Sequence, residues 1–125
     1  MESFNVLLVD DEGEFLDTLV KRIQKRKVNA TGVKSGEDAL AFLGKNPVDV
    51  VVLDVRMPGM DGIETLRALK RQHPLTEVIM LTGHASLEVA IEGMELGAFD
   101  YLMKPVEIDD LLYKIQDANK RRSIQ

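Results

Sequence analysis

Short apolar segments of strand length alternate along the chain with segments whose apolar residues recur at helical spacing. Strands are predicted at Asn5–Val9, Val28–Val33, Asp49–Leu53, Glu77–Leu81 and Phe99–Met103. The first of them is a nearly continuous apolar run, which is typical of a buried strand. The run at Val28–Val33 is weaker and predicts an edge strand.

Each predicted strand is followed by a predicted helix. The clearest is the apolar stripe at Leu87, Ala90, Ile91 and Met94, which has the i, i+3, i+4, i+7 spacing of one helix face. The other four helices are predicted from apolar residues at helical spacing around Leu16, Leu40, Leu66 and Leu111.

Polar residues and glycines mark several helix ends. Ser35 followed by Asp38 resembles a capping box, with Asp in place of the usual Glu or Gln. Asp61 can cap the third helix, which Pro74 should end. Gly97 is positioned to close the fourth helix.

Strict alternation of strand and helix predicts an α/β fold, in which helices cover both faces of a parallel sheet. The 125 residues suit one domain, 1–125, with one core. The chain shows no repeat or linker, so it is either a free-standing domain or one taken from a longer protein.

Composition excludes several classes of function. A net charge of −5 argues against nucleic-acid binding by this domain, and the absence of cysteine excludes disulfides and thiolate metal sites. No apolar stretch approaches the roughly 20 residues that span a bilayer. The first residues lack the features of a signal peptide. A cytoplasmic protein without membrane contact is therefore expected.

Polar residues follow four of the predicted strands. Asp10 and Asp11 follow the first, Asp54 the third, Thr82 the fourth and Lys104 the fifth. Because ligands of open parallel sheets bind beyond the carboxyl ends of the strands, these side chains should meet at one rim. The acid Asp54, at the end of the run Val50–Leu53, should lie where chemistry can reach it.

Clustered carboxylates repel one another, so acids gathered around Asp54 favour a bound cation. Oxygen ligands without cysteine favour Mg²⁺, with Mn²⁺ as a substitute. A carboxylate such as Asp54 can act as a nucleophile and form an aspartyl-phosphate. Lys104 and Thr82 could then neutralise the phosphoryl oxygens.

Four runs of sequence carry a family resemblance. They are Leu7–Glu12, Leu53–Gly62, Leu81–His84 and Gly97–Pro105. In this order and at these spacings, the chain resembles a response-regulator receiver domain of two-component signalling over essentially its whole length. The resemblance implies a flavodoxin-like fold, a doubly wound five-stranded parallel sheet of order 2-1-3-4-5 with five helices.

The resemblance also assigns metal and phosphoacceptor roles. Asp54 is the expected phosphoacceptor. Asp11 is expected to bind Mg²⁺ directly and Asp10 largely through water, while the backbone carbonyl of Arg56 would be a further ligand. Lys104 is expected to contact the phosphoryl group.

Further roles concern the switch and the partners. Thr82 and Tyr101 are the expected switch pair, and the bond between Lys104 and Pro105 is expected to be cis. A sensor histidine kinase or histidine phosphotransfer protein would supply the phosphoryl group. Pairing of two phosphorylated copies is a further hypothesis.

Other functions remain open. A Mg²⁺-dependent phosphohydrolase with an aspartyl nucleophile is the main alternative, although Arg56 stands where such enzymes place an acid two residues after the nucleophile. A binding module with a degenerate site, or a flavin-binding protein, would also suit the fold. The chain has no P-loop motif for nucleotides.

Overall fold

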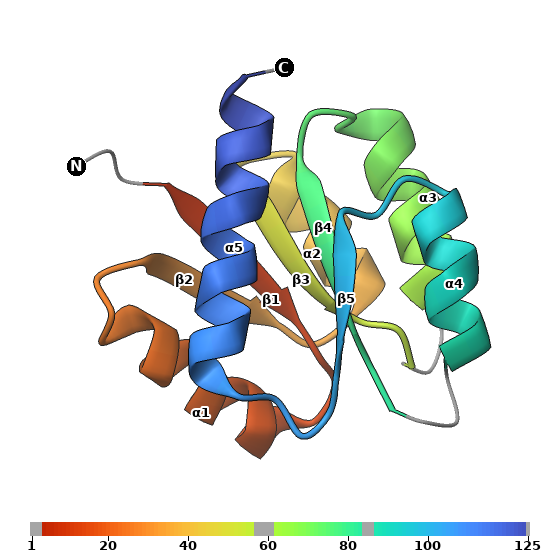
Figure 1. The fold of residues 1–125 in the computed structure, drawn as a ribbon. Coiled ribbons are helices and arrows are strands. Elements are labelled where there is room, and N and C mark those ends of the chain that lie inside the picture. Colours follow the sequence, from red (N-terminus) through yellow and green to blue (C-terminus); the bar gives the residue numbers. More distant parts are fainter. Residues whose placement is uncertain (1–3, 57–61, 84–86, 125) are drawn as a thin grey trace.

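Five parallel strands form one sheet in the computed structural model, which describes residues 4–56, 62–83 and 87–124 (Figure 1). The strands are β1 (Asn5–Val9), β2 (Asn29–Val33), β3 (Val50–Asp54), β4 (Glu77–Thr82) and β5 (Asp100–Met103). Their order, β2-β1-β3-β4-β5, confirms the prediction, and β2 is an edge strand as expected. The bounds of β1 match the predicted ones, and the ends of the other strands differ from the prediction by at most one residue.

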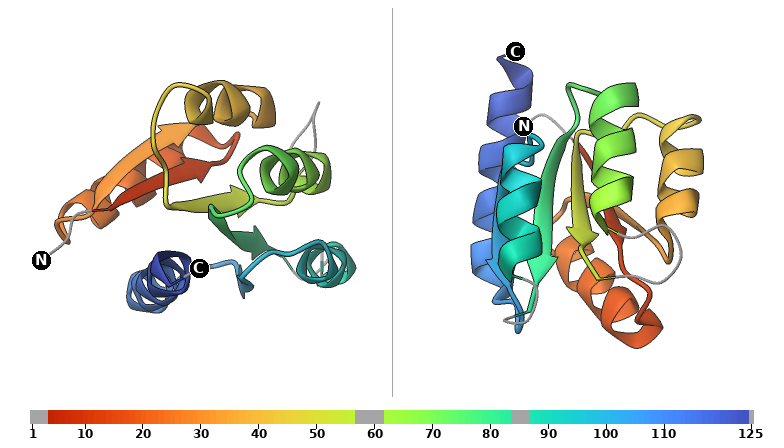
Figure 2. Two further views of the ribbon diagram at one scale, coloured as in Figure 1. Left: turned by 90° about the horizontal axis from the view of Figure 1, so that it is seen from above. Right: turned by 90° about the vertical axis from the view of Figure 1, so that its right-hand side faces the viewer.

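Helices cover both faces of the sheet, which makes the fold flavodoxin-like (Figure 2). The helices α1 (Gly13–Gln24) and α5 (Ile108–Ser123) lie on one face. The other face carries α2 (Gly36–Leu43), α3 (Gly62–Gln72) and α4 (Leu87–Glu95). Within the described ranges, each helix is too short or too polar to cross a bilayer.

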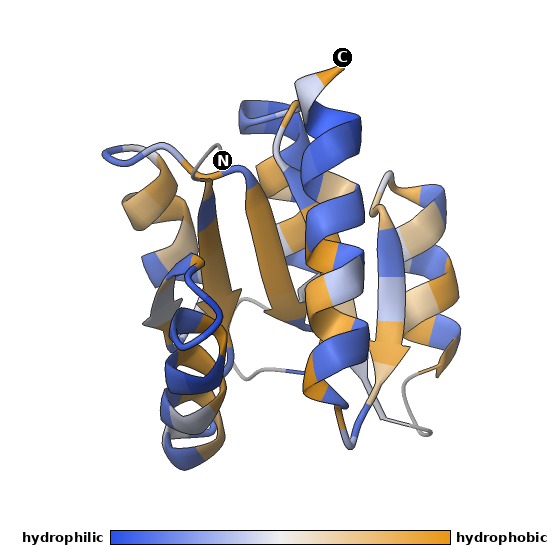
Figure 3. Ribbon diagram, turned by 60° about the vertical axis from the view of Figure 1, so that its left-hand side comes forward, coloured by the Kyte–Doolittle hydropathy of each residue, from blue (hydrophilic) through white to orange (hydrophobic). Residues whose placement is uncertain are grey.

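The core consists of two layers of apolar side chains, one on each face of the sheet. Alternate residues of β3 enter opposite layers, with Val51 and Leu53 facing α2 and α3, and Val50 and Val52 facing α1 and α5. Every residue of β3 is buried. In Figure 3 the orange of hydrophobic residues lies along the central strands and on the helix faces that point towards the sheet. Burying one such side chain stabilises the fold by about 1.5–3 kcal/mol.

The helix ends test the predicted caps. The Ser35 hydroxyl oxygen accepts a hydrogen bond from the Asp38 backbone N–H at 3.0 Å, which confirms the cap of α2. Gly97 follows α4 with φ +106°, a conformation that favours glycine. The predicted cap at Asp61 lies outside the described residues.

Helix α4 is present, but its predicted stripe does not face the core as a whole. Ala90 is buried, together with Gly93 from outside the stripe. The larger members of the stripe are exposed: Leu87 (37%), Ile91 (52%) and Met94 (38%). The reason is close approach, because a Cβ atom at Gly93 would lie only 2.2 Å from the Met80 sulfur. Small residues therefore face the sheet and the large ones lie to the side.

Acidic side chains at the amino ends of β3 and β4 are paired with cationic side chains of α3 and α5, which lie on opposite faces of the sheet. Glu77, which is 3% exposed, lies 3.5 Å from Arg121 Nε and 3.8 Å from Lys70 Nζ. Asp49, just before β3, lies 3.1 Å from an Arg122 guanidinium nitrogen. The last turns of α5 are therefore fixed to this end of the sheet.

Candidate functional site

Three acids meet at the carboxyl end of the sheet. Asp10 follows β1, and Asp54 is the last residue of the neighbouring strand β3, whose Leu53 pairs in register with Val9. Carboxylate oxygens of Asp10, Asp11 and Asp54 lie within 4.8 Å of one another. Asp10 and Asp54 are buried, whereas Asp11 is exposed. The cluster is thus open to solvent on the side of Asp11.

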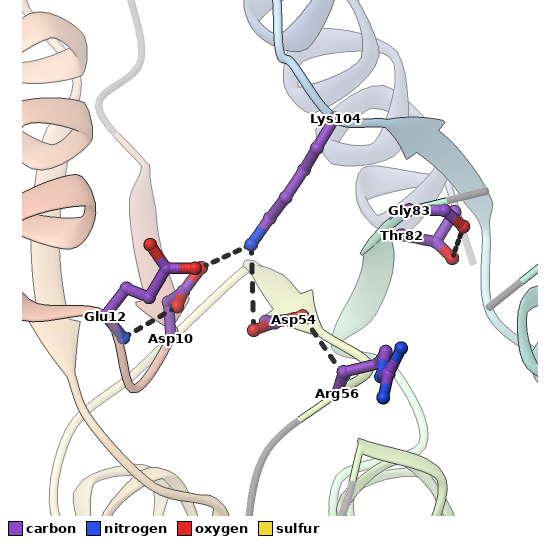
Figure 4. Close-up of polar contacts among 7 residues, drawn as sticks. All are labelled: Asp10, Glu12, Asp54, Arg56, Thr82, Gly83 and Lys104. Atoms are coloured by element: carbon purple, nitrogen blue, oxygen red, sulfur yellow. Dashed lines mark hydrogen bonds and ion pairs between the residues drawn. The ribbon is translucent and has the colours of Figure 1, made fainter. Parts of the chain in front are cut away.

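The Lys104 ammonium group lies between two of these acids (Figure 4). Its nitrogen donates a hydrogen bond to Asp10 Oδ2 at 3.1 Å and lies 3.7 Å from Asp54 Oδ2. The Lys104 backbone N–H donates to the Thr82 carbonyl at 2.8 Å, which ties the end of β5 to β4. The ammonium therefore bridges side chains from β1 and β3.

Backbone amides orient the two buried carboxylates. The Arg56 N–H donates to Asp54 Oδ1 at 3.0 Å, and the Glu12 N–H donates to Asp10 Oδ1 at 2.9 Å. In both acids the other oxygen, Oδ2, faces Lys104. Each carboxylate is therefore held by its own following turn and aimed at the centre of the cluster.

The positive charge near Asp54 does not offset the negative charge of the clustered acids. The pKa of Asp54 is raised from its ordinary value of 3.8 to about 6, chiefly by burial. The neighbouring Asp10 and Asp11 also raise this pKa, whereas the Arg56 hydrogen bond and Lys104 lower it. Burial alone would lower the pKa of Lys104, but the Asp54 and Asp10 carboxylates outweigh it and raise that pKa. One lysine does not compensate the acids around it.

Comparison with known proteins decides the family. Residues 6–116 match the family described as the response regulator receiver domain. The chain belongs to this family. Among curated relatives of this receiver domain, the DNA-binding transcriptional regulator NtrC of Salmonella typhimurium is 36% identical over 113 residues. The heme response regulator HssR of Staphylococcus haemolyticus is 36% identical over 118 residues.

The receiver domain corresponds to only part of these relatives. The match covers 90% of this chain but 24% of NtrC, and 94% of this chain but 52% of HssR. Solved receiver domains match over nearly their whole length. That of NtrX from Brucella abortus gives a TM-score of 0.88 at 29% identity, covering 92% of this chain and 98% of that one. A receiver domain from Clostridium thermocellum gives 0.92 at 35% identity, covering 97% and 98%.

The acidic cluster of this receiver domain fits a hard divalent cation. Its donors are carboxylate oxygens close enough to share one ion, and Lys104 only partly offsets the charge of the buried Asp54. The Arg56 backbone carbonyl as a further ligand remains a prediction. The exposed Arg56 side chain has no part in the cluster, although its backbone N–H does.

The predicted switch residues lie on β4 and β5. The hydroxyl of Thr82, which is 1% exposed, donates to the Gly83 carbonyl at 3.1 Å rather than to Asp54 (Figure 4). Tyr101 is half-buried and packs against the core layer formed with α2, α3 and α4. Their switching role stays a prediction. The peptide bond between Lys104 and Pro105 is cis.

Residues 57–61 of the second matched run and His84 of the third lie outside the described residues. One neighbour of the cluster was not expected from the sequence. The Phe15 ring of α1 lies under the Lys104 ammonium, with 4.7 Å between the nitrogen and the ring centroid. Its spacing indicated only a core-facing helix position.

Proposed function

We propose that this receiver domain, residues 1–125, is the phosphoacceptor switch of a two-component system. Asp54 accepts a phosphoryl group from the phosphohistidine of a sensor histidine kinase or of a histidine phosphotransfer protein. The observation that carries the proposal is the buried Asp54 carboxylate, held beside Asp10, Asp11 and Lys104 and short of positive charge.

The proposed reaction is a transfer between two nucleophiles. A bond forms between an Asp54 carboxylate oxygen and phosphorus, the bond from phosphorus to the donor imidazole nitrogen breaks, and the electron pair of that bond returns to the imidazole. Lys104, already 3.7 Å from Asp54 Oδ2, balances negative charge on the phosphoryl oxygens. The Thr82 hydroxyl would leave the Gly83 carbonyl and donate to a phosphoryl oxygen.

We assign the metal site to the carboxylates of Asp10, Asp11 and Asp54, with the Arg56 backbone carbonyl. Mg²⁺, or Mn²⁺ in its place, would supply positive charge for the phosphoryl oxygens. Asp10 and Asp54 are already oriented by backbone N–H groups, so a cation would find its ligands largely preformed.

The proposed output is a shift between two conformations. Phosphorylation adds a charge of about −1.5 to −2 at the end of β3. Movement of Thr82, followed by Tyr101 turning inward, would change the surface made by α4, β5 and α5. Pairing of two phosphorylated copies is one way to use that surface. We place this reaction in the cytoplasm.

The test is intact-mass measurement with a small phosphodonor such as acetyl phosphate. The wild type should gain the mass of one phosphoryl group in Mg²⁺ and none in EDTA, and Asp54→Asn should gain none. Asp17→Asn, an exposed acid on α1, is the matched control and should behave as the wild type. An equal gain by Asp54→Asn would refute the assignment. Multiple turnover of a phosphate ester would instead support a phosphohydrolase.

A further inference from the structure

The contact between Phe15 and Lys104 joins the site to the core. The Lys104 nitrogen lies 4.7 Å from the Phe15 ring centroid, within the range of a cation–π interaction. The same nitrogen reaches Asp10 at 3.1 Å and Asp54 at 3.7 Å. The ammonium therefore has carboxylates and an aromatic face around it, and its side chain is 25% exposed.

Phe15 is held by the fold rather than by the site. It lies near the start of α1 and packs against the core layer shared by α1 and α5, beside buried Leu16. The Lys104 ammonium, in contrast, lies at the end of a long flexible side chain. A ring fixed by apolar packing can thus restrict where the ammonium lies.

We propose that Phe15 is a positioning residue for phosphoryl transfer, which keeps the Lys104 ammonium next to Asp54. This inference rests on the function proposed above. An aromatic face attracts the cation through its quadrupole and does not need a hydrogen bond from it. A carbonyl or a further carboxylate at the same place would occupy a donor. The ring therefore leaves donors for the phosphoryl oxygens.

The decisive experiment varies the electrostatics of the ring at nearly constant shape. Phe15 is replaced by mono-, di- and trifluorophenylalanine, which progressively weaken the negative ring face. The rate of Asp54 phosphorylation by acetyl phosphate in Mg²⁺ should fall stepwise through the series. Phe15→Leu, which keeps an apolar side chain, should slow phosphorylation by roughly 3- to 10-fold, the range of one partly buried cation–π contact. Phe15→Trp should retain the wild-type rate.

Two controls separate positioning from folding. The Mg²⁺ affinity of the fluorinated proteins should match that of the wild type, and each protein should still unfold in one cooperative urea transition. In a Lys104→Met background the same series should show no trend. A flat series in the wild-type background, with Phe15→Leu slow, would overturn the inference because only ring shape would matter.

A second measurement reads the contact itself. Protons on the Lys104 carbon next to the nitrogen should resonate upfield under the ring current, and Phe15→Leu should abolish that shift. A missing upfield shift would overturn the inference even if Asp54 is phosphorylated normally. If the wild type shows the upfield shift but gains no phosphoryl group, the proposed function is refuted. The contact between Phe15 and Lys104 would then exist without a role in phosphoryl transfer.

Discussion

Replacing Asp54 by asparagine should stabilise the metal-free domain at neutral pH. The pKa of Asp54 is about 6 in the folded protein against an ordinary value of 3.8. Each pKa unit is worth about 1.4 kcal/mol, so keeping Asp54 ionised in the folded state costs about 3 kcal/mol. Asparagine has nearly the same shape, carries no charge, and its amide oxygen can still accept from the Arg56 N–H.

The sign of the pH dependence follows from the raised pKa. The folded state binds the Asp54 proton more tightly than the unfolded chain does, because burial disfavours the carboxylate. Well below pH 3.8 Asp54 is protonated in both the folded and the unfolded state, so its burial does not lower the free energy of unfolding. As the pH rises from 3.8 through about 6, the unfolded chain loses the proton first and stability is lost. The advantage of Asp54→Asn should grow over that interval and then level off.

Urea unfolding without metal, at about pH 4 and about pH 7.5, measures this difference. With a slope of about 2 kcal/mol per molar urea, the midpoint of Asp54→Asn should exceed that of the wild type by roughly 1.5 M at the higher pH. Near pH 4 the two midpoints should nearly coincide. The predicted cost of burying this carboxylate is refuted if Asp54→Asn is less stable than the wild type at pH 7.5, or if the difference between their midpoints does not change with pH. In either case burial of the Asp54 carboxylate would not be what chiefly destabilises the metal-free domain.

Three further predictions concern packing, charge and metal. Gly62→Ala should destabilise by about 2–4 kcal/mol in urea unfolding because its Cβ would lie 2.3 Å from the Val55 Cα, whereas Gly83→Ala, with no atom within 4 Å, should stay within about 0.5 kcal/mol. Asp109→Asn removes an ion pair whose side chains are 49% and 82% exposed, and a loss above about 1 kcal/mol would contradict its surface character. Millimolar Mg²⁺ should raise the melting temperature of the wild type in calorimetry but have a much smaller effect on Asp11→Asn.

Much of the fold could be predicted because buried parallel strands leave a strong pattern. The apolar run ending at Asp54 indicates a central strand, and alternation of strands and helices restricts the topology. The meeting of Asp10 with Asp54 could be predicted for the same reason, since neighbouring parallel strands bring their carboxyl ends together.

What could not be predicted depends on contacts between distant segments. The spacing of the α4 residues cannot reveal that Gly93 packs onto Met80 and turns Ile91 outward. Likewise, Phe15 has the periodicity of any core residue, and its contact with Lys104 joins residues from opposite ends of the chain. Hydroxyl direction is equally hidden, so the Thr82 bond to its neighbour's carbonyl was not expected.

The two ends of the sheet differ in how well their charges are compensated. At the amino ends, Glu77 and Asp49 contact cationic side chains from α3 and α5. At the carboxyl ends, like charges are held together around Asp54. Local opening should therefore be easier at one end of each central strand than at the other. In native-state hydrogen exchange without metal, amide protection should decline along β3 towards Asp54, and Mg²⁺ should flatten that gradient.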